Sequence, residues 1–175
     1  MSKAFTKEET PDDPVIVPER APLPPGVPNY VTERGKALLE DEHRRLSEER
    51  VRLKAEQTEE GAEERNKALA IINRRLAELA ERIATARVVQ PPANPDKTVR
   101  FGATVTLKNL EGRAAGELRH ITLVGVDEAG ESADLVSFSA PIARAILGHR
   151  PGDTVRRRTQ SGEEALQIVE VEYQR

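Results

Sequence analysis

Apolar residues in the first half of the chain repeat at helical spacing in two separate stripes. One stripe recurs every seven residues, and the other alternates steps of three and four, which is the heptad signal. The first stripe is Leu39, Leu46 and Leu53, and the second is Leu69, Ile72, Leu76, Leu79, Ile83 and Ala86. The segment that holds both stripes contains no proline and is rich in helix-forming residues. Thr32 is suited to cap its first helix.

The two stripes do not belong to one continuous helical face. Continued by sevens, the first stripe reaches only charged residues, which are Glu60, Lys67, Arg74 and Glu81. Each leucine of the first stripe instead has an apolar partner the same number of residues beyond Gly61: Leu53 with Leu69, Leu46 with Leu76, and Leu39 with Ile83. Glycine tolerates the positive φ that a tight interhelical turn needs. This pattern predicts an antiparallel coiled-coil hairpin with its tip at Gly61 and, as a consequence, a monomer. The alternative is one long helix in a parallel dimer, which the phase break disfavours.

The second half of the chain alternates with the period of β-strands. Apolar and polar residues alternate over 99–108, and strand-like runs follow at 120–126, 153–159 and 166–173. Between them, "SAPIARAILG" (139–148) predicts a short helix with Pro141 in its first turn and Gly148 at its end. The fold class we predict is α+β: the hairpin, then a small domain with an antiparallel sheet and one short helix.

Proline-rich segments divide the chain into four parts. Residues 1–30 predict a disordered tail, either a simple linker or a short peptide that binds a partner. The hairpin covers 31–89, "QPPANPDK" lies in a linker at 90–98, and the C-terminal domain covers 99–175. No apolar run reaches transmembrane length and no signal-peptide core is present, so we expect a cytoplasmic protein with no membrane partner.

Composition and charge exclude several classes of function. The formal net charge is −3, so no global basic field attracts nucleic acid. The absence of cysteine excludes disulfides and thiolate chemistry. No phosphate-binding loop, dinucleotide fingerprint or nucleophile elbow is present. The three histidines, His43, His120 and His149, are scattered without ligand or triad spacing. The sequence therefore shows none of these catalytic motifs.

Two charged clusters remain as candidate sites. A basic run lies on a predicted strand and is either a solvated face or a contact for an acidic partner or a phosphate backbone; it comprises Arg156, Arg157 and Arg158. The predicted hairpin tip carries acids on both sides of the glycine, which are Glu59, Glu60, Glu63 and Glu64. They form either a solvated turn or a set of carboxylates presented to a cation. Mg²⁺ accepts one or two protein carboxylates, and Glu60 with Glu63 is the candidate pair.

Several motifs resemble the Gre family of bacterial transcript-cleavage factors, in particular its B-type branch. "SFSAPIARAILGHRPGD" (137–153) is similar to the Ser-Pro-hydrophobic-Ala-Arg-Ala-Leu-hydrophobic-Gly segment of that family and the Gly-Asp that follows it. "RFGATVTL" and "LVGVDE" resemble the strands before it, and "MSKAF" and "NYVT" resemble the B-type leader. Thr32, Gly35, Leu39, Glu42 and Leu46 have the spacing of the family's first helix.

The resemblance implies a function. The C-terminal domain is expected to have an FKBP-like fold without isomerase activity and to bind bacterial RNA polymerase at its secondary channel. The polymerase-binding residues carried over are Pro141, Ile142, Arg144, Ala145, Leu147 and Gly148. The hairpin is expected to enter the channel, where tip acids help the polymerase hold a second Mg²⁺ for hydrolysis of its own transcript. The resemblance implies that the protein is not itself an enzyme, because any RNA hydrolysis would use the polymerase active site. The protein would have no cofactor of its own and would reach nascent RNA only through the polymerase.

This chain departs from the family pattern at the tip. The family's Asp-x-x-Glu-Asn motif is missing, and Glu60-x-x-Glu63 is the nearest equivalent. The hairpin is shorter than the family's by roughly ten residues in total, or about five per helix, which shortens its reach by about 7–8 Å at the helical rise. Two functions therefore stay open: stimulation of transcript cleavage, and regulation from within the channel without cleavage. A prolyl isomerase or chaperone module is the alternative from a different class.

Overall fold

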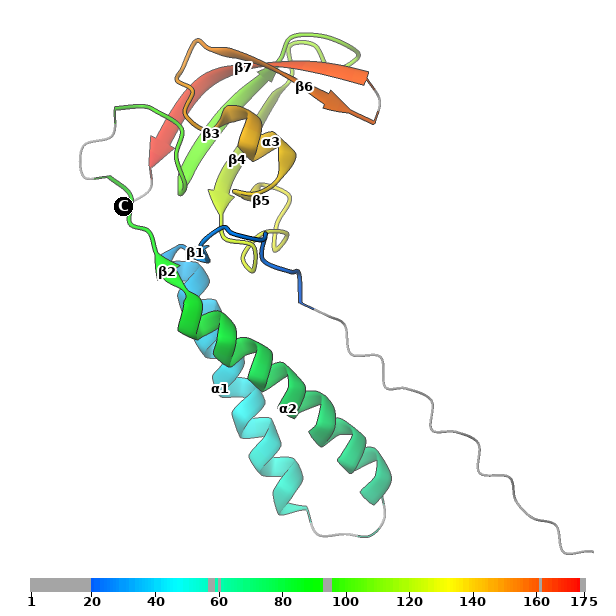
Figure 1. Ribbon diagram of the computed structural model, residues 1–175. Helices are drawn as coiled ribbons and strands as arrows, with labels where there is room; N and C mark the ends of the chain where they lie inside the picture. The colour runs from blue at the N-terminus through cyan, green and yellow to red at the C-terminus, as the bar shows by residue number, and fades with distance from the viewer. Residues whose placement is uncertain (1–19, 57–58, 60, 93–95, 161, 174–175) are drawn as a thin grey trace, which may run out of the picture.

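A computed structural model describes residues 20–56, 59, 61–92, 96–160 and 162–173. A two-helix rod projects from a small α+β domain (Figure 1). The rod consists of α1 (Glu33–Ala55) and α2 (Ala62–Thr85), so each helix is about 35 Å long at the helical rise. The predicted hairpin and the predicted fold class are confirmed.

Local residue chemistry explains where the helices start. The Thr32 hydroxyl accepts a hydrogen bond from the backbone N–H of Gly35 at 2.8 Å, which satisfies a donor in the first turn of α1. Gly61 caps α2 with φ +76°, a left-handed conformation that glycine adopts without a Cβ penalty. The expected positions of the helix cap and the hairpin turn are thus both correct.

The apolar stripes pack together near the base of the rod. The buried members of this core are Val31, Leu39, Leu46, Ile72, Leu76 and Leu79. Toward the tip, Leu53 is only partly buried against the core, Leu69 is half-buried, and Figure 1 shows the helices diverging. The hairpin is therefore held together at its base, while its distal half buries little apolar surface.

A two-stranded parallel ladder closes the base of the rod, and the sequence analysis missed it. It pairs β1 (Tyr30–Val31) with β2 (Arg87–Val88). Beside it, the Asn29 amide donates to the Arg82 carbonyl at 2.9 Å and to the Thr85 hydroxyl at 3.2 Å. Asn29 thereby satisfies a carbonyl in the last turn of α2, where intrahelical donors run out.

The C-terminal domain is built on a five-stranded sheet in the order β5-β4-β3-β7-β6. Its strands are β3 (Ala103–Asn109), β4 (Leu118–Val124), β5 (Leu135–Ser137), β6 (Thr154–Thr159) and β7 (Gly162–Tyr173), and α3 (Pro141–Ile146) precedes β6. The pairs β3–β4, β3–β7 and β6–β7 are antiparallel, but β4 and β5 are parallel. The sheet is therefore mixed, which corrects the prediction of an antiparallel sheet. The sequence pattern missed β5 because three residues show no alternation.

Helix α3 and one face of the sheet enclose the domain core. Ile142, Ala143 and Ile146 of α3 pack against buried residues of the strands, which include Val105, Leu107, Ile121, Leu123, Ile168 and Val171. The predicted first strand, 99–108, begins later than expected. Its N-terminal part is a turn in which Gly102 has φ +83° and donates to the Leu123 carbonyl at 2.8 Å. The FKBP-like assignment of this domain stays a prediction.

The N-terminal segment differs from its prediction over residues 20–30. Residues 1–19 lie outside the described residues, so the disordered tail stays a prediction for them. Residues 20–30 pass between the base of the rod and the C-terminal domain (Figure 1). Arg20 binds carboxylates on both parts, and Val31, which follows, is buried. Specific contacts therefore order a proline-rich segment that composition alone assigns to a tail.

Candidate functional site

The candidate site at the tip of the rod presents exposed carboxylates. Glu59, Glu63 and Glu64 are exposed and flank Gly61, as predicted. Glu60, the fourth candidate, lies outside the described residues. The Glu63 carboxylate accepts a hydrogen bond from Lys67 at 2.8 Å while its side chain stays 73% exposed.

These acids do not need a bound cation to be stable. Glu63 and Glu64 lie in the first turn of α2, where the helix dipole favours negative charge. Within the described residues, no group of three or more His, Cys, Asp or Glu residues could hold a metal ion. The donor set suits one or two supplementary ligands to an ion held elsewhere, as Mg²⁺ permits. It does not form a cage.

The second candidate surface is the segment around α3, which divides between surface and core. Pro141, Arg144 and Gly148 are exposed, and Ala145 and Leu147 are half-buried. Ile142 is 7% exposed and belongs to the domain core. Ile142 lies in the same motif as its exposed neighbours, but its side chain contributes to folding and is not available at the surface.

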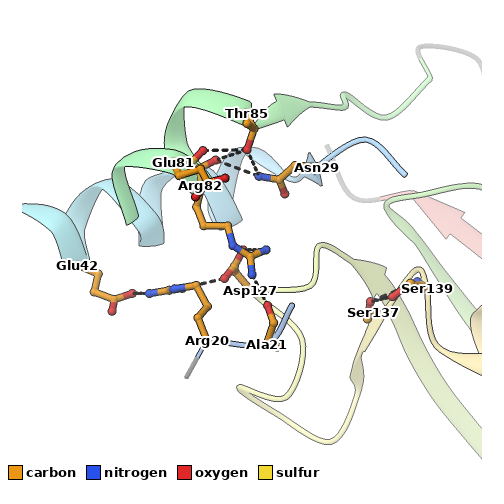
Figure 2. Close-up of polar contacts among 10 residues, drawn as sticks. All are labelled: Arg20, Ala21, Asn29, Glu42, Glu81, Arg82, Thr85, Asp127, Ser137 and Ser139. Carbon is orange, nitrogen blue, oxygen red and sulfur yellow. Dashed lines mark hydrogen bonds and ion pairs between the residues drawn. The ribbon is translucent and has the colours of Figure 1, made fainter. Parts of the chain in front are cut away.

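The turn into α3 is built from serine hydroxyls. The hydroxyls of Ser137 and Ser139 lie 2.7 Å apart, and the Ser139 N–H donates to the Ser137 hydroxyl at 3.2 Å (Figure 2). The N-cap of α3 is Ala140, which has no side-chain cap bond. These contacts hold the turn that leads into α3.

The basic run on β6 is partly neutralised within the domain. Arg156 is exposed and pairs with Glu111 at 3.2 Å. Arg157 is half-buried and pairs with Glu164 at 2.6 Å. Arg158 is exposed. The three residues therefore do not form one continuous basic surface, because the charge of Arg157 is paired with Glu164 on the neighbouring strand β7.

The histidines remain apart, as the sequence predicts. His120 contacts the Thr106 hydroxyl at 3.0 Å on the sheet, and His149 lies 3.3 Å from the Asp153 carboxylate. His43 is half-buried on α1. Because they lie on α1, on β4 and in the segment between α3 and β6, they do not compose a nucleophile or ligand set.

A third charged cluster lies between the rod and the C-terminal domain, and sequence reasoning missed it. Asp127, in the loop after β4, has a side chain only 5% exposed and lies 2.8 Å from Arg20 and 3.4 Å from Arg82 of α2 (Figure 2). Arg82 also donates to the Ala21 carbonyl. The Arg82 Nη1 and Asp127 Oδ2 atoms lack hydrogen-bond partners but face each other as this ion pair.

The neighbouring carboxylate of the same loop contacts the start of α1. Glu128 is 3% exposed, accepts from the Thr32 hydroxyl at 2.5 Å and pairs with Arg34 at 2.8 Å. The hydrogen bond to Glu128, together with that to Glu131, raises the pKa of the Arg34 guanidinium. A Cβ on Gly35 would lie 2.8 Å from the Glu128 carboxylate. The helix and the loop therefore approach as closely as a glycine allows.

An aromatic cluster also lies where the base of the rod meets the C-terminal domain. Tyr30 of β1 packs against Phe101 at 6.0 Å and against Phe138 at 5.8 Å between ring centroids, and the two phenylalanines are 5.6 Å apart. A Cβ on Gly125 would lie 2.8 Å from the Tyr30 carbonyl oxygen. The joint therefore combines apolar packing with buried charge pairs, and we call residues 30–35, Arg82 and 125–128 the joint.

Residues of the C-terminal domain match a known family of proteins. Residues 94–173 match the family model described as "Transcription elongation factor, GreA/GreB, C-term". The chain is 38% identical over 96 residues to "Transcription elongation factor GreA" of Helicobacter hepaticus, which is 55% of this chain and 57% of that protein. It is 39% identical over 97 residues to the protein of that name from Alkalilimnicola ehrlichii, covering 55% and 60%. The chain thus spans less than two thirds of these relatives.

Among solved structures, "Prokaryotic transcription elongation factor GreA/GreB from Nitrosomonas europaea" aligns with 84% of this chain and 99% of that chain. Its sequence identity is 23% and the TM-score is 0.40.

Within the described ranges, neither the rod helices nor α3 has the apolar length that a bilayer crossing requires.

Proposed function

We propose that the chain is a member of the Gre family of transcription elongation factors and that it binds bacterial RNA polymerase at the secondary channel. The observation that carries the proposal is the family match over 94–173 in a chain whose preceding residues form a rod with an acidic tip. In this proposal the C-terminal domain binds the channel rim, and the rod points its tip toward the active centre. The protein acts as a monomer in this complex.

The exposed part of the α3 segment is the proposed docking surface. Pro141, Arg144 and Gly148 are solvent-exposed on one side of a helix whose other side is core. Arg144 is the charged group of this set, and arginine is favoured at protein interfaces because its planar guanidinium forms several directed hydrogen bonds. Ala145 and Leu147 border the surface, and Ile142 supports it from the core.

The tip acts in this proposal as a negative charge delivered near the active centre. The lack of the family's Asp and Asn at the tip, together with the Glu63–Lys67 contact, favours regulation of nucleotide addition over full stimulation of cleavage. If an ion of the polymerase is reached, Glu59, Glu60, Glu63 and Glu64 are its candidate carboxylates, and such an ion would supply charge stabilisation at the transcript phosphate. The protein itself performs no hydrolysis.

One experiment on stalled transcription complexes tests the tip. The parent protein is compared with a variant in which Glu59, Glu60, Glu63 and Glu64 are all replaced by Gln. A matched control neutralises four exposed acids in the middle of the rod, namely Glu40, Asp41, Glu48 and Glu49. Release of short 3′ RNA fragments and the rate of nucleotide addition are measured, together with affinity for polymerase.

The outcomes separate the candidate functions. Slowed nucleotide addition by the parent and the control variant, but not by the tip variant, supports regulation by tip charge. Fragment release that disappears only in the tip variant supports cleavage stimulation. Equal behaviour of all three proteins in both assays would contradict any role for the tip, and absence of polymerase binding would contradict the proposal as a whole.

The rival from a different class is a prolyl isomerase or chaperone. The aromatic residues that could line a proline pocket are engaged elsewhere, because Phe101 and Phe138 pack against Tyr30 of the rod base. We expect no acceleration of cis–trans isomerisation in a peptide assay. Acceleration that is lost on substitution of Phe138 would favour the rival.

A further inference from the structure

Residues 20–28, here called the strap, contact both halves of the molecule. The Arg20 guanidinium donates to the Glu42 carboxylate of α1 at 2.6 Å and to the Asp127 carboxylate of the C-terminal domain at 2.8 Å (Figure 2). The next residue, Ala21, accepts a hydrogen bond from Arg82 of α2. Two consecutive strap residues therefore contact α1, α2 and the loop after β4.

The strap depends on these polar contacts more than on apolar packing. A cavity of about 540 Å³ lies between the strap and α2, lined by residues of both, including Leu23, Val27, Glu78 and Glu81. The middle of the strap therefore does not pack closely on the helix. Its contacts concentrate at Arg20 and Ala21 at one end and at Asn29, which follows its other end.

The composition of the strap lowers the entropy lost when it is held in place. It contains Pro22, Pro24, Pro25 and Pro28, which restrict the free chain and leave less freedom to lose. Gly26 has φ +73° in a turn closed by the bond from the Val27 N–H to the Pro24 carbonyl at 3.3 Å. A stiff segment of this kind transmits position better than a flexible one.

The Arg20 guanidinium is stabilised in its charged form by carboxylates of both the rod and the C-terminal domain. Burial lowers the pKa of its guanidinium, but the hydrogen bonds to Asp127 and Glu42 outweigh burial and hold the pKa above its ordinary value. Asp127 is nearly buried, and Arg82 alone would remain beside it if Arg20 were removed. Of the charge pairs at the joint, that of Asp127 therefore depends in part on the strap, whereas those of Glu128 do not.

We propose that Arg20 is a positioning residue, which holds the rod at a fixed angle to the C-terminal domain. The chain already connects the two parts through β2 and the residues after it, on one side of the rod base. In Figure 1 the strap reaches the base on the other side. Contacts of Tyr30, Thr32 and Arg34 also hold the base, and Arg20 adds a contact that joins α1 to the loop after β4. Removal of Arg20 therefore leaves the angle of the rod less constrained. Its relevance to transcription rests on the proposed function, since the angle decides where a docked protein places its tip.

A distance measurement in the free, full-length protein tests the proposal without polymerase. The chain has no cysteine, so spin labels can be placed at Val51 on the rod and Arg113 on the C-terminal domain, both exposed. We compare the parent with Arg20→Ala, with Asp127→Asn, and with Arg44→Ala as the matched control. Arg44 is an exposed arginine whose ion pairs, to Asp41 and Glu48, stay within α1.

We expect Arg20→Ala and Asp127→Asn to broaden the distance distribution and add a displaced population, with helix content close to the parent. The thermal midpoint should stay close to the parent in Arg20→Ala and fall in Asp127→Asn, because the latter leaves Arg82 without its nearly buried partner. Arg44→Ala is expected to leave the distribution unchanged. A distribution in Arg20→Ala that matches Arg44→Ala would overturn the proposal. So would broadening that appears only in Asp127→Asn, because the strap would then make no contribution.

The same variants connect the angle to function. If the parent binds polymerase, Arg20→Ala should keep its affinity, because Arg20 lies outside the α3 surface, yet lose the tip-dependent effect on nucleotide addition. An unchanged tip effect despite a broadened distribution would overturn the functional part of the inference. If the parent does not bind polymerase, the proposed function fails while the distance result still stands or falls by itself.

Discussion

The base and the tip of the rod differ in almost every physical respect. At the base, Asp127 and Glu128 are nearly buried against arginines, and glycines permit backbone approach. At the tip, Glu59, Glu63 and Glu64 are exposed, and Gly61 has open space around its Cα. The base sets where the rod points, and the tip presents charge. Substitutions should therefore change stability and geometry at the base, and polymerase-dependent effects at the tip.

The largest effect on stability is expected at the core of the rod base. Leu79 is 0% exposed, so Leu79→Ala should cost about 2–5 kcal/mol of unfolding free energy, the usual range for a buried leucine. Val51, toward the tip, is 64% exposed, so Val51→Ala should stay within about 0.5 kcal/mol. Urea unfolding monitored by circular dichroism measures both, and similar losses would contradict the contrast between base and tip.

Close approach at the joint predicts the next effect. Gly125→Ala places a Cβ 2.8 Å from the backbone carbonyl of Tyr30, which cannot move aside, and should cost about 1–3 kcal/mol. Gly35→Ala meets the Glu128 side chain at the same distance. Because a side chain can rotate away, Gly35→Ala should cost less in the same unfolding experiment. The reverse order would show that Glu128 is held more rigidly than the β1 backbone.

A substitution at the hairpin turn should lower the unfolding free energy by less, and through backbone conformation instead of a steric clash. Gly61 has φ +76° and no atom within 4 Å of a built Cβ, so Gly61→Ala meets no clash and only the left-handed backbone disfavours it. The expected cost is about 1 kcal/mol. Gly61→Asn should recover part of it, because asparagine tolerates that conformation better. Equal stability of the two variants would mean that the turn adopts another conformation.

The smallest stability effects are expected for the tip acids. Replacing Glu63 and Glu64 with Gln removes the dipole interaction in the first turn of α2 and the Lys67 pair, a loss of about 0.3–1 kcal/mol. Added salt should shrink this difference because the charges are exposed. A gain in stability would indicate that repulsion among the tip acids outweighs the dipole.

A pH-dependent effect is expected where the linker enters the C-terminal domain. The Thr98 N–H donates to the Asp96 carboxylate at 3.1 Å. This bond and the Arg100 guanidinium lower the pKa of Asp96 below its ordinary value of 3.8. The contribution of Asp96 to stability is thus fully present above pH 3.8 and is lost as pH falls through the folded-state pKa. Asp96→Asn should be less stable than the parent at neutral pH, and the difference should vanish in acid.

Local patterns predicted the rod well and the joint poorly. The leucine stripes and Gly61 lie within one segment, so their spacing contains the information for a hairpin. By contrast, Asp127 meets Arg20 across 107 residues of sequence, and no spacing rule connects them. Strands β1, β2 and β5 have two or three residues each, too few to show a period. Their partners are fixed only once the chain has folded.

The candidate sites divide in the same way. The motif around α3 predicted the short helix correctly, but which of its residues lie at the surface and which in the core depends on the sheet that packs beneath. Ile142 therefore became part of the core, while Arg144 stayed exposed. The exposure of Glu59, Glu63 and Glu64 was predicted correctly because exposure at a hairpin turn follows from the sequence alone. Their stabilisation by the start of α2 depends on where that helix begins.

The most direct test of the account is a pair of cross-links to RNA polymerase from single cysteines carrying a photoreactive group. One cysteine replaces Glu59 at the tip and the other replaces Arg150, which follows the C-terminal docking surface, and both positions are exposed. The account predicts that the Arg150 position cross-links to the rim of the secondary channel and the Glu59 position to polymerase residues near the catalytic centre. Cross-links from Glu59 confined to the outer surface of the polymerase, with Arg150 still at the rim, would contradict the claim that the base aims the tip into the channel.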